Sequence, residues 1–172
     1  GHGHVPRQGA RARSLALFHP SMREEARDRL ALEEALRHAV GNGEIISHLQ
    51  PIVRLADRQL VGFEALARWQ HPHQGLLTPA AFIAAAEDSG LIEGIDLCVM
   101  EAACRAVGRW QHLPGLEQLR LSVNVSARTL SASDLVERIQ PILESSGIAP
   151  ARLYLEITET SLVEDIQSTT ST

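Results

Sequence analysis

The sequence has few cysteines, no long apolar run and no excess of positive charge. Its two cysteines, Cys98 and Cys104, are too few for a disulfide framework or a zinc site, so we expect reduced packing residues in a cytoplasmic protein. No stretch approaches the roughly 18 apolar residues of a membrane span. We therefore expect no membrane contact from this segment. A membrane anchor in other domains of a parent protein is compatible with this expectation. A net charge of −5 without a basic stripe argues against binding of duplex nucleic acid.

The composition is otherwise that of a folded globular domain, with 44% hydrophobic and 22% charged residues. A length of 172 residues fits one domain, or one domain with an appendage. It is too short for a complete (β/α)₈ barrel, which rarely has fewer than about 200 residues.

Hydrophobic periodicity predicts an opening pair of strands and then strands that alternate with helices. A charged connector helix is expected within residues 20–43, ended by Gly41-Asn42-Gly43. Further strands are expected over residues 45–53, 60–69, 119–125 and 152–158, and further helices over residues 80–89, 95–111 and 131–146. This order is typical of an α/β protein with a largely parallel sheet.

Two helix starts carry sequence signals. Thr78, followed by Pro79, is expected to cap the helix over residues 80–89. Ser131, with Asp134 three residues later, is expected to open the helix over residues 131–146, in which Pro141 should introduce a kink.

Three of the expected strands carry an oxygen-bearing side chain near the carboxyl end of their polar face. Because strand side chains alternate, these are Glu64, Asn124 and Glu156. Ligands of α/β sheets and barrels bind at the carboxyl ends of strands. Two carboxylates and an amide oxygen suit Mg²⁺ or Mn²⁺ better than Zn²⁺. The alternative is that these side chains only end their strands and face water.

These residues belong to an ordered set of motifs. The set comprises Gln50-Pro51-Ile52-Val53, Val-Gly-Phe-Glu-Ala-Leu-Ala-Arg-Trp (61–69), His71-Pro72, Phe82-Ile83, Gly90-Leu91-Ile92, Val123-Asn124-Val125-Ser126 and Leu155-Glu156-Ile157-Thr158-Glu159-Thr160. In this order and spacing it resembles the EAL domain of bacterial cyclic di-GMP phosphodiesterases over about residues 44–166.

The resemblance implies a fold, a reaction and a set of site residues. EAL domains form a modified (β/α)₈ barrel with an antiparallel first strand, and they hydrolyse cyclic di-GMP to the linear dinucleotide with Mg²⁺ or Mn²⁺. The implied metal ligands are Glu64, Asn124 and Glu156, and the implied substrate contacts are Gln50 with a guanine edge, Leu66 by packing and Arg68 with a phosphate. Glu159 would steady a neighbouring loop.

The family's later motifs, among them Asp-Asp-Phe-Gly-Thr-Gly, are not found in these 172 residues. The expected fold is therefore a partial (β/α)₈ barrel, the N-terminal half of an EAL domain, over residues 44–172. The connector helix precedes it, and residues 1–19 resemble the end of an upstream GGDEF domain. The expected function is that of a cyclic di-GMP phosphodiesterase, with the chain alone inactive. The alternative is a catalytically silent EAL domain that acts as a cyclic di-GMP receptor or a protein-interaction module.

A partial barrel would leave the strand at residues 152–158 with an unpaired edge and its inner face open. We therefore expect a homodimer, besides cyclic di-GMP as the ligand. Trp69 and Trp110 are interpreted as core anchors, and His71 and His73 as parts of a structural turn and not as metal ligands.

Overall fold

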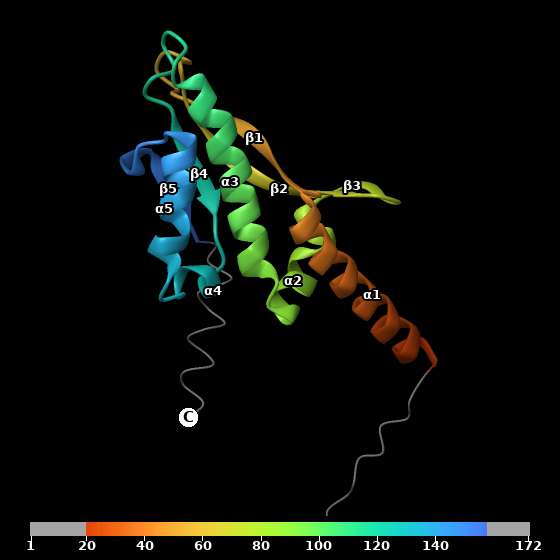
Figure 1. Cartoon of the computed structure of the whole chain (residues 1–172). Helices are drawn as coiled ribbons and strands as arrows, with labels where there is room; N and C mark the ends of the chain where they lie inside the picture. The colour runs from red at the N-terminus through yellow and green to blue at the C-terminus, as the bar shows by residue number, and fades with distance from the viewer. Residues whose placement is uncertain (1–19, 158–172) are drawn as a thin grey trace, which may run out of the picture.

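The computed structural model describes residues 20–157, so residues 1–19 and 158–172 lie outside the description, Glu159 among them (Figure 1). The strands are β1 (Ile45–Val53), β2 (Leu60–His71), β3 (Gly75–Leu77), β4 (Arg120–Asn124) and β5 (Leu153–Glu156). The helices are α1 (Pro20–Asn42), α2 (Ile83–Ser89), α3 (Ile92–Trp110), α4 (Ala127–Leu130) and α5 (Leu135–Ser146), with 3₁₀ turns η1 (Pro79–Ala81) and η2 (Pro150–Arg152).

One sheet joins all five strands, in the order β1-β2-β4-β5 with β3 attached to β2. The pairs β1–β2 and β2–β3 are antiparallel, whereas β2–β4 and β4–β5 are parallel. The four expected strands are therefore present within the described residues, together with the antiparallel first pair that the family resemblance implied. The short strand β3 was not predicted.

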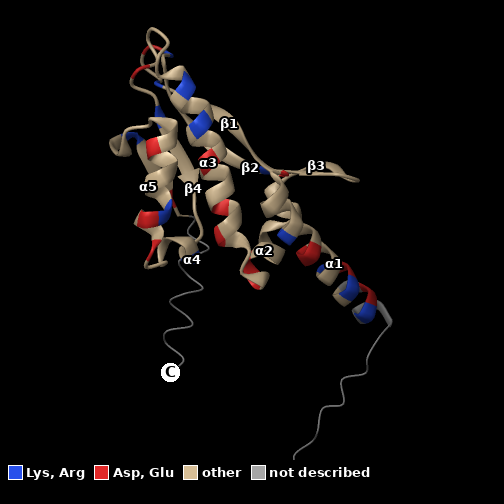
Figure 2. Ribbon diagram, in the orientation of Figure 1, with Lys and Arg blue, Asp and Glu red and all other residues tan. Residues whose placement is uncertain are grey.

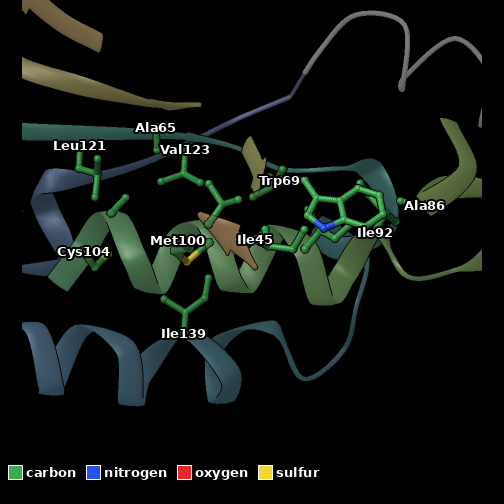
Figure 3. Close-up of a cluster of buried hydrophobic side chains, with 14 of the residues drawn as sticks. Ile45, Ala65, Trp69, Ala86, Ile92, Met100, Cys104, Leu121, Val123 and Ile139 are labelled. Carbon is green, nitrogen blue, oxygen red and sulfur yellow. The ribbon is translucent and has the colours of Figure 1, made fainter. Parts of the chain in front are cut away.

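The core lies between the sheet and α3, with α5 on the outer side of α3 (Figure 3). Leu121 and Val123 of β4 are fully buried on the face that the strand alternation assigns to the core. Met100 faces them from α3, and Ile139 of α5 packs beneath that helix (Figure 3). The apolar row of each parallel strand is thus covered by helices, which leaves the polar row on the opposite face.

Both cysteines are free thiols within this core region. Burial raises the pKa of the Cys104 thiol to about 11, so it stays protonated near neutral pH. Cys98 is half-buried, and its Sγ lies 3.7 Å from the carbonyl oxygen of Val40 in α1. Both cysteines therefore pack against the core, as the sequence predicts.

Trp69 anchors the end of β2, as predicted. Its indole is fully buried and donates to Glu44 Oε2 at 3.1 Å, and its ring lies edge-on to Phe82 at 5.9 Å. His71, two residues later at the end of β2, accepts the backbone N–H groups of His73 and Gln74 through Nδ1, at 3.1 and 3.2 Å. The ring nitrogen therefore shapes the turn into β3, which agrees with a structural turn.

The expected helix starts were wrong in detail. Thr78 makes no capping hydrogen bond through its side chain, and the 3₁₀ turn η1 precedes α2. Ser131 does not open a long helix but ends the separate helix α4, which Ser126 caps at its start by accepting the N–H of Thr129 at 3.1 Å. Helix α5 begins only at Leu135 and continues through Pro141.

Helix α1 occupies the expected connector segment, but its C-terminal half is part of the core. Leu36 and Ala39 are fully buried, which the description of a merely charged connector did not anticipate. Figure 2 shows both acidic and basic residues along α1, and Arg29 pairs with Asp88 of α2. None of the helices in the described part is long and apolar enough to cross a membrane.

Candidate metal centre at the carboxyl ends of the strands

The three predicted oxygen ligands lie on one face of three neighbouring strands. Asn124 of β4 is the register partner of Glu156 of β5. Glu64 of β2 is opposite Ser122, which precedes Asn124 by two residues and so shares its face. The Asn124 amide Nδ2 donates to Glu64 Oε1 at 2.9 Å. The structure thus brings Glu64 and Asn124 into direct contact and places Glu156 beside Asn124.

The chemistry of this donor set fits a hard divalent cation, because it contains only carboxylate and amide oxygens. Glu64 and Asn124 are half-buried and Glu156 is exposed, so all three can be reached from solvent. Within residues 20–157, no group of three or more His, Cys, Asp or Glu side chains could hold a metal. A metal centre at this place would therefore need Asn124 as its third ligand, and the described residues would offer it fewer ligands than a two-metal site requires.

The predicted substrate contacts share the face of Glu64. Gln50 of β1 is the register partner of Glu64, and Leu66 and Arg68 follow Glu64 at intervals of two residues along β2. At about 3.4 Å per residue, Arg68 lies about 14 Å beyond Glu64 along the strand. Arg68 Nη1 donates to the carbonyl oxygen of Ala67 at 2.7 Å, which leaves further guanidinium donors for a ligand.

A cavity of about 430 Å³ opens at the carboxyl ends of β2 and β4. Glu64, Leu66 and Asn124 line it from the sheet, and Ile83 of α2 lines it from the helical side. Gln50, Arg68 and Glu156 are not among its lining residues. The cavity therefore collects three of the six predicted site residues that the structure describes, and the other three lie outside it on the same face of the sheet.

Sequence reasoning missed Asp96, a buried carboxylate that also lines this cavity. Its Oδ2 accepts the backbone N–H of Ser126 at 2.8 Å and the hydroxyl of Thr129 at 2.7 Å, and it lies 2.9 Å from Ser126 Oγ. Burial raises the pKa of Asp96, and these hydrogen bonds oppose the rise. The sequence signal that could have identified Asp96 is its position one helical turn before Val99, on the apolar stripe of the predicted helix.

Glu93, one turn earlier in α3, joins three helices near the same end of the sheet. It accepts Arg128 Nε of α4 at 2.8 Å and Arg138 Nη1 of α5 at 2.9 Å. The Arg138 hydrogen bond, followed by that of Arg128, lowers the pKa of Glu93 below its ordinary value. Glu93 thus stays ionised and fixes α4 and α5 relative to α3.

An antiparallel first pair, parallel strands alternating with helices, and oxygen ligands at the carboxyl ends define a barrel-type α/β protein with a candidate divalent-metal site. The model of the EAL domain family matches residues 33–172, and the chain belongs to this family.

Two curated relatives come from Pseudomonas aeruginosa. The cyclic di-GMP phosphodiesterase NbdA is 43% identical over 144 residues, which cover 84% of this chain and 18% of NbdA. The bifunctional diguanylate cyclase/cyclic di-GMP phosphodiesterase MucR is 35% identical over 148 residues, which cover 86% of this chain and 22% of MucR. The chain thus spans about a fifth of the length of these two relatives.

Solved EAL structures share the fold. A PaMucR phosphodiesterase in complex with c-di-GMP matches with a TM-score of 0.70 and 34% identity, over 80% of this chain and 56% of that chain. The EAL enzyme Bd1971, in a form with cAMP and cyclic di-GMP bound, matches with a TM-score of 0.71 and 28% identity, over 81% and 39%. The predicted fold class, a partial (β/α)₈ barrel of the EAL family, is confirmed.

Proposed function

We propose that this chain forms the metal- and substrate-binding part of a cyclic di-GMP phosphodiesterase. The observation that carries the proposal is the 2.9 Å hydrogen bond between Asn124 and Glu64, with Glu156 in register beside Asn124. The names of NbdA and MucR and the c-di-GMP complex of the PaMucR phosphodiesterase support the choice of substrate.

In this proposal Glu64, Asn124 and Glu156 hold Mg²⁺ or Mn²⁺ through side-chain oxygens. The bound cation would supply charge neutralisation and a more acidic water for attack on the phosphodiester. Arg68 binds a phosphate oxygen with its free guanidinium donors, because a planar fork suits that anion.

Two further residues orient the substrate in this proposal. Leu66 lines the cavity and packs against the ligand, and Gln50 hydrogen-bonds a guanine edge from the neighbouring strand. Glu159 would steady a loop beside the centre.

The first experiment measures Mn²⁺ binding to the chain by isothermal titration calorimetry. We expect Glu64→Gln and Asn124→Ala to abolish binding, because each removes one of only three ligands. Glu101→Gln is the matched control, since Glu101 is exposed on α3 and pairs with Arg105. Unchanged Mn²⁺ affinity in the two site variants would refute the assignment of the centre.

The second experiment separates an enzyme from a receptor. The chain is incubated with cyclic di-GMP and Mn²⁺, and the linear product is measured by anion-exchange chromatography. We propose that the chain alone binds cyclic di-GMP without turnover, because three ligands are fewer than a two-metal site needs. Product from the chain alone would overturn this. A full-length protein that binds but never hydrolyses would establish the receptor function.

We also propose that the chain forms a homodimer through β5. In the described sheet, β5 pairs only with β4 and its outer edge is open, and Tyr154 is 44% exposed. An open edge offers unpaired N–H and C=O groups to a second copy. Size-exclusion chromatography with light scattering tests this, and a stable monomer would refute it.

The division of the chain is proposed as a possible end of an upstream GGDEF domain at residues 1–19, a connector at 20–43 and the EAL half from residue 44. MucR, which is named as both a cyclase and a phosphodiesterase, supports such an arrangement. The free thiols of Cys98 and Cys104 support a cytoplasmic location. The complete gene sequence tests the division, and fractionation of the native cells tests the location.

A further inference from the structure

The backbone that follows Asn124 is held from two sides. The N–H of Val125 donates to the carbonyl oxygen of Glu156 at 2.8 Å, which ties the end of β4 to β5. The N–H of Ser126 donates to Asp96 Oδ2 at 2.8 Å, which ties the same strand end to α3. Both donors lie within two residues of Asn124, so the position of the Asn124 side chain depends on both bonds.

The α3 side of this attachment is a preformed acceptor. Asp96 is 7% exposed and Thr129 is fully buried. Ser126 Oγ lies 2.9 Å from both Asp96 Oδ2 and Thr129 Oγ1, and it also caps α4. Because neighbouring donors converge on a single oxygen, the carboxylate is fixed in direction and holds Ser126 in one place.

Asn124 in turn extends across the strand to Glu64. Glu64, Asn124, Ser126 and Asp96 all line the cavity of about 430 Å³. A continuous set of contacts therefore runs from α3 through the turn after β4 to the candidate metal ligands on β2 and β4.

We propose that Asp96 is a positioning residue for the metal centre. Through the Ser126 N–H it holds the end of β4 so that the Asn124 amide faces Glu64 and Glu156. The inference rests on the proposed function of these ligands. Residues that orient metal ligands typically change metal affinity by about 10- to 100-fold when they are replaced.

A pair of substitutions at Ser126 isolates the backbone bond. Ser126→Ala removes the hydroxyl and keeps the N–H that Asp96 accepts. Ser126→Pro removes both, and its fixed φ near −65° suits the observed φ of −70°. The difference between the two variants therefore reports on the N–H bond to Asp96, and Asp96→Asn tests the acceptor itself.

The Mn²⁺ affinity of each variant is measured by calorimetry, after circular dichroism has shown that the variant is folded. We expect Ser126→Ala to stay within about threefold of the unmodified chain, and Ser126→Pro and Asp96→Asn to bind at least about tenfold more weakly. Glu101→Gln on the same helix is the control. If Ser126→Pro and Asp96→Asn bind Mn²⁺ as tightly as Ser126→Ala does, the proposal is overturned.

A metal-free measurement distinguishes this inference from the proposed function. The side-chain NH₂ signals of Asn124 are followed by nuclear magnetic resonance, and we expect them to shift and exchange faster in Ser126→Pro and Asp96→Asn only. If the unmodified chain binds no Mn²⁺ but these signals still change, the metal assignment fails and the positioning role stands. If the signals do not change, Asp96 only stabilises α4, and the positioning role is refuted.

Discussion

Gly108 of α3 lies in close contact with the backbone of α5. A Cβ atom at this position would lie 2.1 Å from the carbonyl oxygen of Ser146 at the end of α5, whereas ordinary contacts begin near 3.4 Å. A backbone oxygen cannot rotate away, so Gly108→Ala must move the two helices apart by more than 1 Å. A gap of 0.5–1 Å between facing atoms already removes about a quarter to a half of their dispersion attraction, so the packing of α5 on α3 would be weakened.

The expected cost follows from two opposing effects. Overpacking of this kind costs about 1–3 kcal/mol, and a backbone contact places this site near the upper end. Replacing a glycine inside a helix by alanine gains about 1 kcal/mol. We therefore expect Gly108→Ala to lower the free energy of unfolding by about 2 kcal/mol, measured by urea denaturation followed by circular dichroism.

Two other helical glycines serve as controls. At Gly94 the new Cβ would lie 3.1 Å from a methyl group of Val40, which can move, so Gly94→Ala should change stability little. At Gly41 nothing lies within 4 Å, and Gly41→Ala should add about 0.5 kcal/mol. If Gly108→Ala is as stable as Gly41→Ala, the close approach of α3 and α5 is refuted.

Three further predictions follow from single side chains. Because the folded state lowers the pKa of Glu93, the stability that this carboxylate contributes is present above its ordinary pKa of 4.5 and is lost as the pH falls through the lower pKa of the folded state. Glu93→Gln should therefore destabilise the chain at pH 7 in urea denaturation, and this difference should shrink as the pH falls below 4.5. Because the pKa of the Cys104 thiol is about 11 in the folded chain instead of 9.0, the thiolate is about 100-fold scarcer there. Iodoacetamide should therefore label Cys104 about 100-fold more slowly in the folded chain than in urea, and equal labelling rates would contradict its burial. Arg68→Ala should weaken binding of cyclic di-GMP about tenfold and reduce its salt dependence in calorimetry, and an unchanged affinity would exclude Arg68 from the site.

The strands were predictable because their signal is local. Alternation between apolar and polar side chains places Leu121 and Val123 in the core and Asn124 on the other face, whatever the rest of the chain does. The range predicted for β1, residues 45–53, agrees with the structure for the same reason. The proximity of Glu64 and Asn124 follows once their strands are neighbours in a parallel sheet.

Features that depend on distant contacts were not predictable in the same way. Ser126 and Ser131 both precede helical segments in the sequence. Ser126 is the residue that caps a helix, and it also contacts Asp96, which lies thirty residues earlier in the sequence. Strand β3 follows a turn that the ring nitrogen of His71 holds. Leu36 is buried because the C-terminal half of α1 docks on the body of the domain, whereas Leu30 of the same helix is 66% exposed, so apolar spacing within α1 does not tell which half docks.

The candidate site contains both kinds of feature, those that follow from local alternation and those that depend on distant contacts. The proposed ligands come from the polar rows of the strands, where alternation identifies them. Asp96 lies on α3, which covers the opposite, apolar side of the sheet, and it is an acidic residue among the apolar residues that pack against the core. A carboxylate at such a position carries a desolvation cost, visible in its raised pKa, and hydrogen bonds must offset that cost. An acid on the apolar stripe of a helix beside a ligand-bearing strand end should therefore be examined as a support for that strand end.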